Sequence, residues 1–219
     1  MKAMILAAGR GRRLEGLTVD TPKPLLTVGG ESLIERHLRR LAGAGFSEIV
    51  INLSYLGDRI RNELGEVSRW GQTLTYSDEG SPALETGGGI INALPLLKPG
   101  PFLIVNADIF TEFDFTTLRC ENRAGHLVLV PNPPEHEYGD FGLASSGMVN
   151  MKLPLLTYSG IAILSPEIFH GFVPGHRPLR PILDAAIAQK MLEGSCYMGM
   201  WSDVGTPDRL IEIRETCGV

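Results

Sequence analysis

The most informative stretch of the sequence is a basic, glycine-containing run near the amino terminus, Leu6-Ala7-Ala8-Gly9-Arg10-Gly11-Arg12-Arg13-Leu14. Gly9 and Gly11 carry no Cβ, so the backbone around them can turn its N–H groups toward a bound anion. Arg12 and Arg13 add positive charge that can follow the charge on phosphate oxygens. The run therefore predicts a phosphate-binding loop.

A lysine between two prolines follows this run, in Thr21-Pro22-Lys23-Pro24-Leu25. The prolines restrict the backbone on either side of Lys23, which favours a fixed position for its ammonium group. Asp20 is the acidic residue nearest in sequence, and an exposed pair of that kind contributes only about 0–1 kcal/mol. We therefore expect Lys23 to act on phosphate charge and to contribute little to stability.

Two separate aspartates supply hard oxygen ligands of the kind that Mg²⁺ prefers. Asp108 ends the apolar run Ile104-Val105-Asn106-Ala107-Asp108, and Asp203 lies in Trp201-Ser202-Asp203-Val204-Gly205-Thr206-Pro207. Thr206 and Pro207 fit the N-cap and first position of a helix, which leaves Asp203 free. An aspartate at a strand end commonly caps a turn, so neither carboxylate alone is specific. Together with the basic loop, the two predict a site for a metal ion and a triphosphate.

A further glycine-rich segment, Leu84-Glu85-Thr86-Gly87-Gly88-Gly89, precedes an expected helix. Three glycines at that position suit the close approach of a ring or a phosphate. A flexible entry into the helix is the alternative interpretation, and the sequence leaves both open.

Other glycine-loop families fit the first run less well. A dinucleotide-binding fingerprint needs a third glycine where this sequence has Leu14, and an acidic residue where it has Asn52. The Walker pattern of nucleotide triphosphatases is absent from the sequence. A tight turn between a strand and a helix would explain two glycines, but not the adjacent arginines and Lys23.

Short runs rich in Ile, Val and Leu alternate with helical patterns along the chain. Ser32 and Glu35 fit a capping box, and the helix that follows repeats apolar residues at helical spacing, with Arg36, Arg39 and Arg40 expected on a solvated face. Strands are expected at residues 3–7, 48–52, 73–77, 102–105, 126–130 and 161–164, and further helices at residues 55–64, 90–97, 181–189 and 207–215.

This alternation predicts an α/β fold with a mostly parallel sheet that is covered on both faces. In such a sheet the ligand-binding residues lie in the loops after the carboxyl ends of the strands. The candidate residues above follow expected strands in this way. We find no internal repeat and no linker-like stretch, so residues 1–219 are expected to form a single domain.

The amino-acid composition is that of an ordinary globular protein. Of the 219 residues, 43% are hydrophobic and 21% are charged, which is ordinary globular usage. The net charge of −5 argues against a nucleic-acid partner, whereas the excess of basic residues among the first 40 suggests a small anionic ligand.

The three cysteines show no metal-binding or disulfide spacing and are expected to be reduced and buried. No apolar run reaches 18 residues, and residues 3–8 are too short for a signal peptide, so no membrane association and a cytoplasmic location are expected.

Several segments of the chain resemble, in their order, the motifs of the sugar-1-phosphate nucleotidyltransferase family. They are residues 6–14, 22–24, 84–88 and 201–206, together with Asp108. The resemblance covers nearly the whole chain. It implies a Rossmann-like, three-layer α/β/α fold and small-molecule substrates. It also implies a reaction in which a sugar 1-phosphate attacks the α-phosphate of a nucleoside triphosphate and pyrophosphate leaves.

The resemblance also implies roles for individual residues. Arg13 and Lys23 would be catalytic, with Arg13 binding the triphosphate and Lys23 bridging its phosphates during transfer. Asp108 and Asp203 would hold Mg²⁺. The implied nucleotide-binding residues are Ala8, Gly9, Gly11, Arg12, Arg13, Thr86 and Gly88, and the implied sugar-binding residues are Gly139, Asp140, Ser159 and Gly160.

Within the family, segments 84–89 and 139–141 are most similar to the branch that uses UTP and N-acetylmuramate 1-phosphate in peptidoglycan recycling. The branch that uses GTP and mannose 1-phosphate is the alternative. The sequence departs from the family pattern at Arg12, Gly16 and Ala107, where Thr, Pro and Gly are usual, and it lacks a Glu-Lys-Pro motif in residues 139–157. Because the chain ends just after the last expected helix, no C-terminal β-helix domain is expected.

Functions of two other classes fit the sequence less well. A non-catalytic nucleotide-sugar sensor would keep the binding glycines but would not need Lys23, Asp108 and Asp203, all of which are present. A nicotinamide-dependent oxidoreductase is disfavoured by Leu14 and Asn52.

Overall fold

The computed structural model describes residues 1–118 and 123–218. Its helices are α1 (Leu33–Gly43), α2 (Gly57–Leu64), α3 (Glu85–Leu97), α4 (Arg180–Ala188) and α5 (Pro207–Thr216). Its strands are β1 (Ala3–Leu6), β2 (Thr27–Val28), β3 (Glu31–Ser32), β4 (Glu48–Leu53), β5 (Thr73–Asp78), β6 (Phe102–Asn106), β7 (Ile109–Thr111), β8 (Gly125–Val130), β9 (Phe141–Leu143), β10 (Val149–Asn150), β11 (Leu155–Leu164), β12 (Leu192–Cys196) and β13 (Trp201–Asp203).

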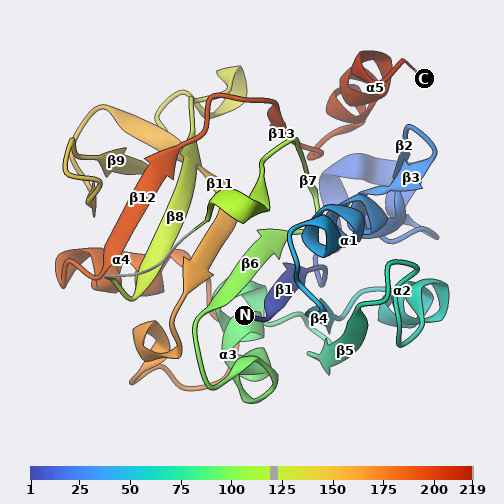
Figure 1. The fold of residues 1–219 in the computed structure, drawn as a ribbon. Coiled ribbons are helices and arrows are strands. Elements are labelled where there is room, and N and C mark those ends of the chain that lie inside the picture. The colour runs from blue at the N-terminus through green and yellow to red at the C-terminus, as the bar shows by residue number, and fades with distance from the viewer. Residues whose placement is uncertain (119–122, 219) are drawn as a thin grey trace.

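The largest sheet in the described residues has nine strands and a parallel centre (Figure 1). Strands β6, β1, β4 and β5 lie side by side and run in parallel, with Ala3 opposite both Ile49 and Leu103. This confirms the predicted α/β class. On the other side of β6, strand β11 pairs in the antiparallel direction and links the parallel centre to β8 and β9.

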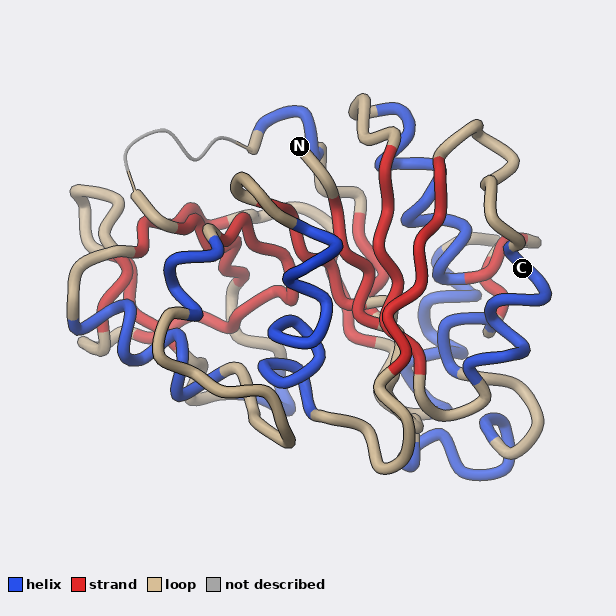
Figure 2. Tube along the Cα trace, turned by 90° about the horizontal axis from the view of Figure 1, so that it is seen from below, coloured by secondary structure: helices blue, strands red, loops and turns tan. Residues whose placement is uncertain are grey.

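Helices cover both faces of this sheet because alternate residues of each strand face opposite sides. Met4 packs in a cluster with residues of α3 and α4, whereas Ala3 and Ile5 pack with residues of α1 and α2. Figure 2 shows the strands from below with helices around them. The three-layer, Rossmann-like arrangement is therefore confirmed. At one end of the molecule, α5 lies beside β2 and β3 (Figure 1).

Among the elements that the sequence predicted, α3 and β11 differ most from their expected bounds. Helix α3 begins at Glu85, earlier than the predicted residue 90, because its glycines are buried against other parts of the chain and this packing outweighs their low helix propensity. Strand β11 is longer than predicted and contains a register shift between Tyr158 and Ile161, where Gly160 has a φ of 80°.

A small two-stranded sheet, β7 with β13, was not predicted. It pairs Ile109 with Asp203 and Thr111 with Trp201, and the N–H of Val204 donates to the carbonyl of Asp108 at 2.8 Å. This pairing brings Asp108 and Asp203 next to each other although they are far apart in the sequence.

Within the described ranges, no helix combines the length and the apolar character needed to cross a membrane. The expectation of buried thiols is wrong for Cys196 and Cys217, which are both exposed. Cys120 lies outside the described residues.

Candidate active site

A cavity of about 870 Å³ opens at the carboxyl ends of β1, β4, β5 and β6. Its walls come from the loops that follow these strands, as expected for a parallel sheet. Of the predicted site residues, those that line it are Ala8, Gly9, Gly11, Arg12, Arg13, Lys23, Thr86 and Asp108. The predicted residues in this lining include Arg12, Arg13, Lys23 and Asp108, which are most of its charged side chains.

The basic loop forms one wall of the cavity. Gly11 has a φ of 66° and immediately precedes the 3₁₀ helix Arg12–Thr18. A Cβ at Gly11 would lie 3.2 Å from the side chains of Lys23 and Thr18, whereas one at Gly9 would meet nothing within 4 Å. Gly11 is thus required by its backbone conformation and by close packing on Lys23, and Gly9 leaves space beside the loop.

Lys23 is buried, and it is paired. Its side chain is only 8% exposed, and Nζ lies 2.6 Å from Oδ2 of Asp108. The pairing follows from the fold, because β1 and β6 are hydrogen-bonded neighbours whose following loops meet at the same edge of the sheet. The expectation that Lys23 lacks an acidic partner other than Asp20 is therefore wrong.

Asp203 lies beside the cavity rather than in its lining. Its carboxylate forms an ion pair with Arg209, and its Oδ2 lies 4.0 Å from Nη2 of Arg13. A Cβ at Gly205 would come within 3.0 Å of Asp203 Oδ2 and 3.1 Å of Arg13 Nη2. The glycine therefore leaves room for the contact between Arg13 and Asp203.

The donor set formed by Asp108 and Asp203 fits Mg²⁺. Asp108 lies in the turn between β6 and β7, and Asp203 lies on β13, which pairs with β7. Their side chains are 37% and 30% exposed and are already paired with cationic side chains. No group of three or more His, Cys, Asp or Glu that could hold a metal occurs among the described residues. Mg²⁺ is commonly held by one or two carboxylates together with water and substrate phosphates, which is the arrangement that this pair allows.

Positive charge is concentrated at the mouth of the cavity. Arg10, Arg12 and Arg13 are exposed there, and the guanidinium of Arg10 lies 5.0 Å from the centre of the Tyr55 ring. Lys23 is instead buried at the inner end of the loop. This distribution suits an anionic ligand with several charges. The exposed arginines can contact the charges nearest the mouth of the cavity, and the fixed ammonium group of Lys23 can contact the charge deepest in it.

Asn52 and Glu79 form a hydrogen-bonded bridge in the cavity wall that the sequence reasoning missed. Asn52 is 3% exposed; its Oδ1 accepts from the N–H of Ala7 at 2.7 Å, and its Nδ2 donates to Glu79 at 2.6 Å. The other carboxylate oxygen of Glu79 accepts from the N–H of Leu84 at 2.8 Å. The bridge ties the phosphate-binding loop to the start of α3. Both residues lie at or just after the ends of strands, so the rule that pointed to Asp108 also applies to them.

The three glycines of α3 serve packing. Gly88 donates its N–H to the carbonyl of Arg177 at 2.9 Å, and a Cβ there would overlap the Gly175 carbonyl. A Cβ at Gly89 would overlap the carboxylate of Glu79. Gly88 does not line the cavity, whereas Thr86 does. Contact with other parts of the chain therefore explains Gly88 without a ligand.

The four residues that the resemblance assigned to the sugar lie outside the cavity lining. Asp140 accepts from the N–H of Tyr158 at 2.8 Å and lies 3.2 Å from His136. Ser159 is fully buried and donates to the Val128 carbonyl at 2.7 Å. Gly139 and Gly160 both have positive φ values and pack closely on Asn132 and Asn106, respectively.

Two of the departures from the family pattern are accommodated without strain. Gly16 is exposed, and a Cβ there would meet no atom within 4 Å. Ala107 is 1% exposed and donates its N–H to the Leu6 carbonyl at 3.0 Å, which anchors the segment before Asp108. Neither replacement disturbs the backbone of the site.

Relatives found by sequence comparison match 94–100% of this chain. An N-acetylmuramate alpha-1-phosphate uridylyltransferase from Neisseria meningitidis is 46% identical, with 100% of this chain and 99% of the relative covered. A protein of the same name from Caulobacter vibrioides is 34% identical over 94% of this chain and 92% of its own length. A mannose-1-phosphate guanyltransferase from Schizosaccharomyces pombe is 29% identical, and the chain covers 61% of that protein.

Solved structures support the fold. HddC from Yersinia pseudotuberculosis, crystallised with GMP-PN, superposes with a TM-score of 0.79 at 23% identity and covers 98% of both chains. A Bacillus anthracis protein crystallised with sucrose superposes with a TM-score of 0.85 at 20% identity, over 99% of this chain and 95% of its own. Residues 2–151 match the profile of a family described as nucleotidyl transferase. With that match and relatives of 46% and 34% identity along its length, the chain belongs to the nucleotidyl transferase family.

Proposed function

We propose that this protein transfers a uridylyl group from UTP to N-acetylmuramate 1-phosphate, with release of pyrophosphate. The observation that carries the proposal is the pairing of buried Lys23 with Asp108 at the inner end of the basic loop, inside a cavity large enough for a nucleotide. The choice of substrates rests on the Neisseria relative, whose name specifies them and which matches the chain from end to end.

In this proposal, the basic loop binds the triphosphate. Gly9, Gly11 and Arg12 surround the phosphates, and Arg13 contacts them from the mouth of the cavity. Ala8 and Thr86 both line the cavity and would border the base and ribose. The bridge between Asn52 and Glu79 ties the backbone of Ala7 to that of Leu84, close to these two residues in the sequence.

Asp108 and Asp203 would hold Mg²⁺. Bound Mg²⁺ supplies positive charge that neutralises phosphate oxygens as negative charge develops on them. With Asp108 bound to the ion, Lys23 would be free to contact the phosphate oxygens. Arg209 and Arg13 keep Asp203 oriented toward the site.

The chemical step is a single in-line displacement. An oxygen of the sugar 1-phosphate forms a bond to the α-phosphorus, and the bond between this phosphorus and the bridging oxygen of the leaving pyrophosphate breaks. A phosphate monoester is already ionised near neutral pH, so the step needs no general base. The chain therefore contributes positioning and charge stabilisation.

On the sugar side, we propose that Gly160 acts through Asn106, and that Ser159 holds β11 in place through its hydrogen bond to the Val128 carbonyl. Gly160 packs on the side chain of Asn106, which lines the cavity next to Asp108. Asp140 and Gly139 shape the adjoining loop through their contacts with Tyr158 and Asn132. These residues are positioning residues in this account.

The alternative substrates are GTP and mannose 1-phosphate. They are supported by guanyltransferase relatives at 28–30% identity, but this chain spans only about three-fifths of their length. The greater identity and fuller coverage of the two uridylyltransferases favour UTP.

We further propose that the chain acts as one domain, because a single sheet contains strands from Ala3 to Cys196. We also propose that it works in the cytoplasm, where nucleoside triphosphates are available.

The test is a pyrophosphate-release assay of the purified protein with UTP, GTP, CTP and dTTP against N-acetylmuramate, glucosamine and mannose 1-phosphates. The proposal requires the highest kcat/KM for UTP with N-acetylmuramate 1-phosphate. A higher value for GTP with mannose 1-phosphate would reject the substrates and keep the reaction class. Binding of nucleotides without turnover of any pair would reject the enzymatic assignment.

A further inference from the structure

The two proposed metal ligands are carried by the small β7–β13 sheet, which we call the ribbon and define as residues 108–112 and 200–204. Its ladder is closed at one end by the hydrogen bond from Val204 to Asp108 (2.8 Å) and at the other by one from Glu112 to Met200 (3.1 Å). The two aspartates are therefore at one end of the ribbon and Glu112 at the other. Among the described residues, the ribbon pairs with no strand of the main sheet, so its orientation depends on its connection to β6 and on side-chain contacts.

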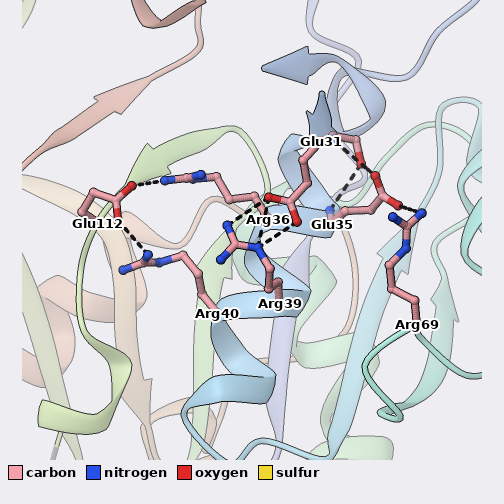
Figure 3. Close-up of polar contacts among 8 residues, drawn as sticks. Glu31, Glu35, Arg36, Arg39, Arg40, Arg69 and Glu112 are labelled. Atoms are coloured by element: carbon pink, nitrogen blue, oxygen red, sulfur yellow. Dashed lines mark hydrogen bonds and ion pairs between the residues drawn. The ribbon is translucent and has the colours of Figure 1, made fainter. Parts of the chain in front are cut away.

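Glu112 is held by two arginines of α1. One carboxylate oxygen forms an ion pair with Nη2 of Arg36, and the other lies 2.8 Å from Nη1 of Arg40. Arg40 also donates to the carbonyl of Phe113 at 2.9 Å. Figure 3 shows Glu112 between the two guanidinium groups, which lie one helical turn apart on α1.

The arginines are well placed to hold the ribbon because they are largely shielded from water. Their side chains are 15% and 18% exposed, and the guanidinium of Arg36 lies 4.1 Å from the centre of the Phe110 ring of β7. Ion pairs shielded in this way are less screened than exposed ones, and the ring contact adds a cation–π attraction. The interpretation of Arg36 and Arg40 as a solvated helix face is therefore wrong.

The neighbouring arginine of α1 provides a comparison. Arg39 binds Glu31 of β3 through three hydrogen bonds of 3.0–3.3 Å and does not bind Glu112 (Figure 3). Glu31 is 20% and Arg39 43% exposed, against 48% for Glu112 and 18% for Arg40, so the two pairs are similarly shielded overall. The two glutamates thus make similar contacts with one helix, but only Glu112 belongs to the ribbon.

We propose that Glu112, held by Arg36 and Arg40, is a positioning residue that orients the ribbon so that Asp108 and Asp203 present their carboxylates together. The inference rests on the proposed function, because it concerns the residues assigned to Mg²⁺. The continuity of the chain from β6 fixes the near end of β7, and Glu112 fixes its far end. Because β7 is only three residues long, a shift of its far end moves the carboxylate end as well.

The test measures Mn²⁺ binding to the purified protein, without substrate, by the loss of the free-ion electron paramagnetic resonance signal. Glu112→Gln is compared with Glu31→Gln, and Arg40→Met with Arg39→Met. We expect Glu112→Gln and Arg40→Met to weaken Mn²⁺ binding about 10-fold, as for other groups that support metal ligands, and both controls to change it less than about 2-fold. Thermal unfolding should shift similarly within each pair.

Equal Mn²⁺ affinity within both pairs would overturn the inference and leave the proposed reaction untouched. The proposed metal site is checked separately with Asp108→Asn, which should abolish the binding. If that variant bound Mn²⁺ like the wild type, the metal assignment would be wrong, and the inference with it. Should Glu112→Gln fail to fold, the arginine pair alone decides, because Arg40→Met leaves Glu112 paired with Arg36.

Discussion

The Nζ atom of Lys23 lies 2.6 Å from Oδ2 of Asp108, and this contact joins the segment after the phosphate-binding loop to the turn that follows β6. Lys23 is almost fully buried, whereas the Asp108 side chain is 37% exposed. The pair is therefore asymmetric: water can hydrate the carboxylate if the lysine is removed, whereas it has little access to the ammonium if the aspartate is removed. Each residue contributes to stability as well as to the proposed chemistry.

This asymmetry predicts which variant unfolds more easily. Asp108→Asn leaves a buried ammonium without a counter-charge and should lower the free energy of unfolding by about 3 kcal/mol, the scale for breaking a buried pair. Lys23→Ala should lower it by about 1 kcal/mol, because the remaining carboxylate is hydrated. Urea unfolding of both variants measures the difference. A larger loss for Lys23→Ala would contradict the assignment of the buried partner.

Activity should depend on the same residues at temperatures where the variants remain folded. Lys23→Ala should reduce kcat by about 10²–10³-fold, since a cation aimed at developing phosphate charge is lost. Asp108→Asn and Asp203→Asn should each remove several kcal/mol of transition-state stabilisation, about 10²-fold or more in kcat, with Mg²⁺ saturating. Asp58→Asn, at an exposed position of α2, is the matched control and should retain wild-type kinetics. Near-normal turnover of either aspartate variant would eliminate that residue as a ligand.

The bridge between Asn52 and Glu79 makes Gly89 sensitive to substitution. A Cβ at Gly89 would overlap the Glu79 carboxylate, so Gly89→Ala should displace Glu79 and raise the KM for the nucleotide by about 10-fold, with a smaller change in kcat. Gly43→Ala is the control, since Gly43 also lies in a helix and a Cβ there meets nothing within 4 Å. That variant should be neutral or more stable by about 0.5–1 kcal/mol. An unchanged KM in Gly89→Ala would show that the bridge does not set the nucleotide site.

His37 predicts a specific dependence of stability on pH. Complete burial lowers its pKa from 6.5 to about 4, against the smaller opposing effects of the Ile109 backbone and Asp108. Between these values the unfolded chain binds a proton that the folded chain does not, so stability is lost as the pH falls through this window. The loss from this residue between pH 7 and pH 5 should be about 2 kcal/mol.

The measurement is urea unfolding of the wild type and His37→Leu at pH 7 and pH 5. The variant should lose about 2 kcal/mol less than the wild type on acidification, whatever its own stability at pH 7. His170→Gln, at an exposed position, should behave as the wild type does. Parallel losses in wild type and His37→Leu would mean that another group carries the acid sensitivity.

Local patterns were enough to predict the main helices, the central strands and the position of the cavity, but not the small sheet of β7 and β13. The capping box of Ser32 and Glu35 is present at the start of α1, and the strand-end rule led to Asp108. The partners of these residues could not be predicted, because Lys23 with Asp108 and Arg40 with Glu112 are brought together only by tertiary structure. The role of Gly89 was missed for the same reason, since its neighbour Glu79 follows a different strand.

The central claim, that an oxygen of the sugar phosphate attacks the α-phosphorus of the nucleotide, is tested most directly by isotope transfer. N-acetylmuramate 1-phosphate labelled with ¹⁸O at its non-bridging phosphate oxygens is reacted with unlabelled UTP. The masses of the products are then measured by mass spectrometry. The account predicts that the nucleotide sugar retains all of the label, with one labelled atom in the bridge between the two phosphorus atoms, and that pyrophosphate carries none. Loss of one labelled oxygen from the nucleotide sugar would show that the sugar phosphorus is attacked instead and would contradict the account.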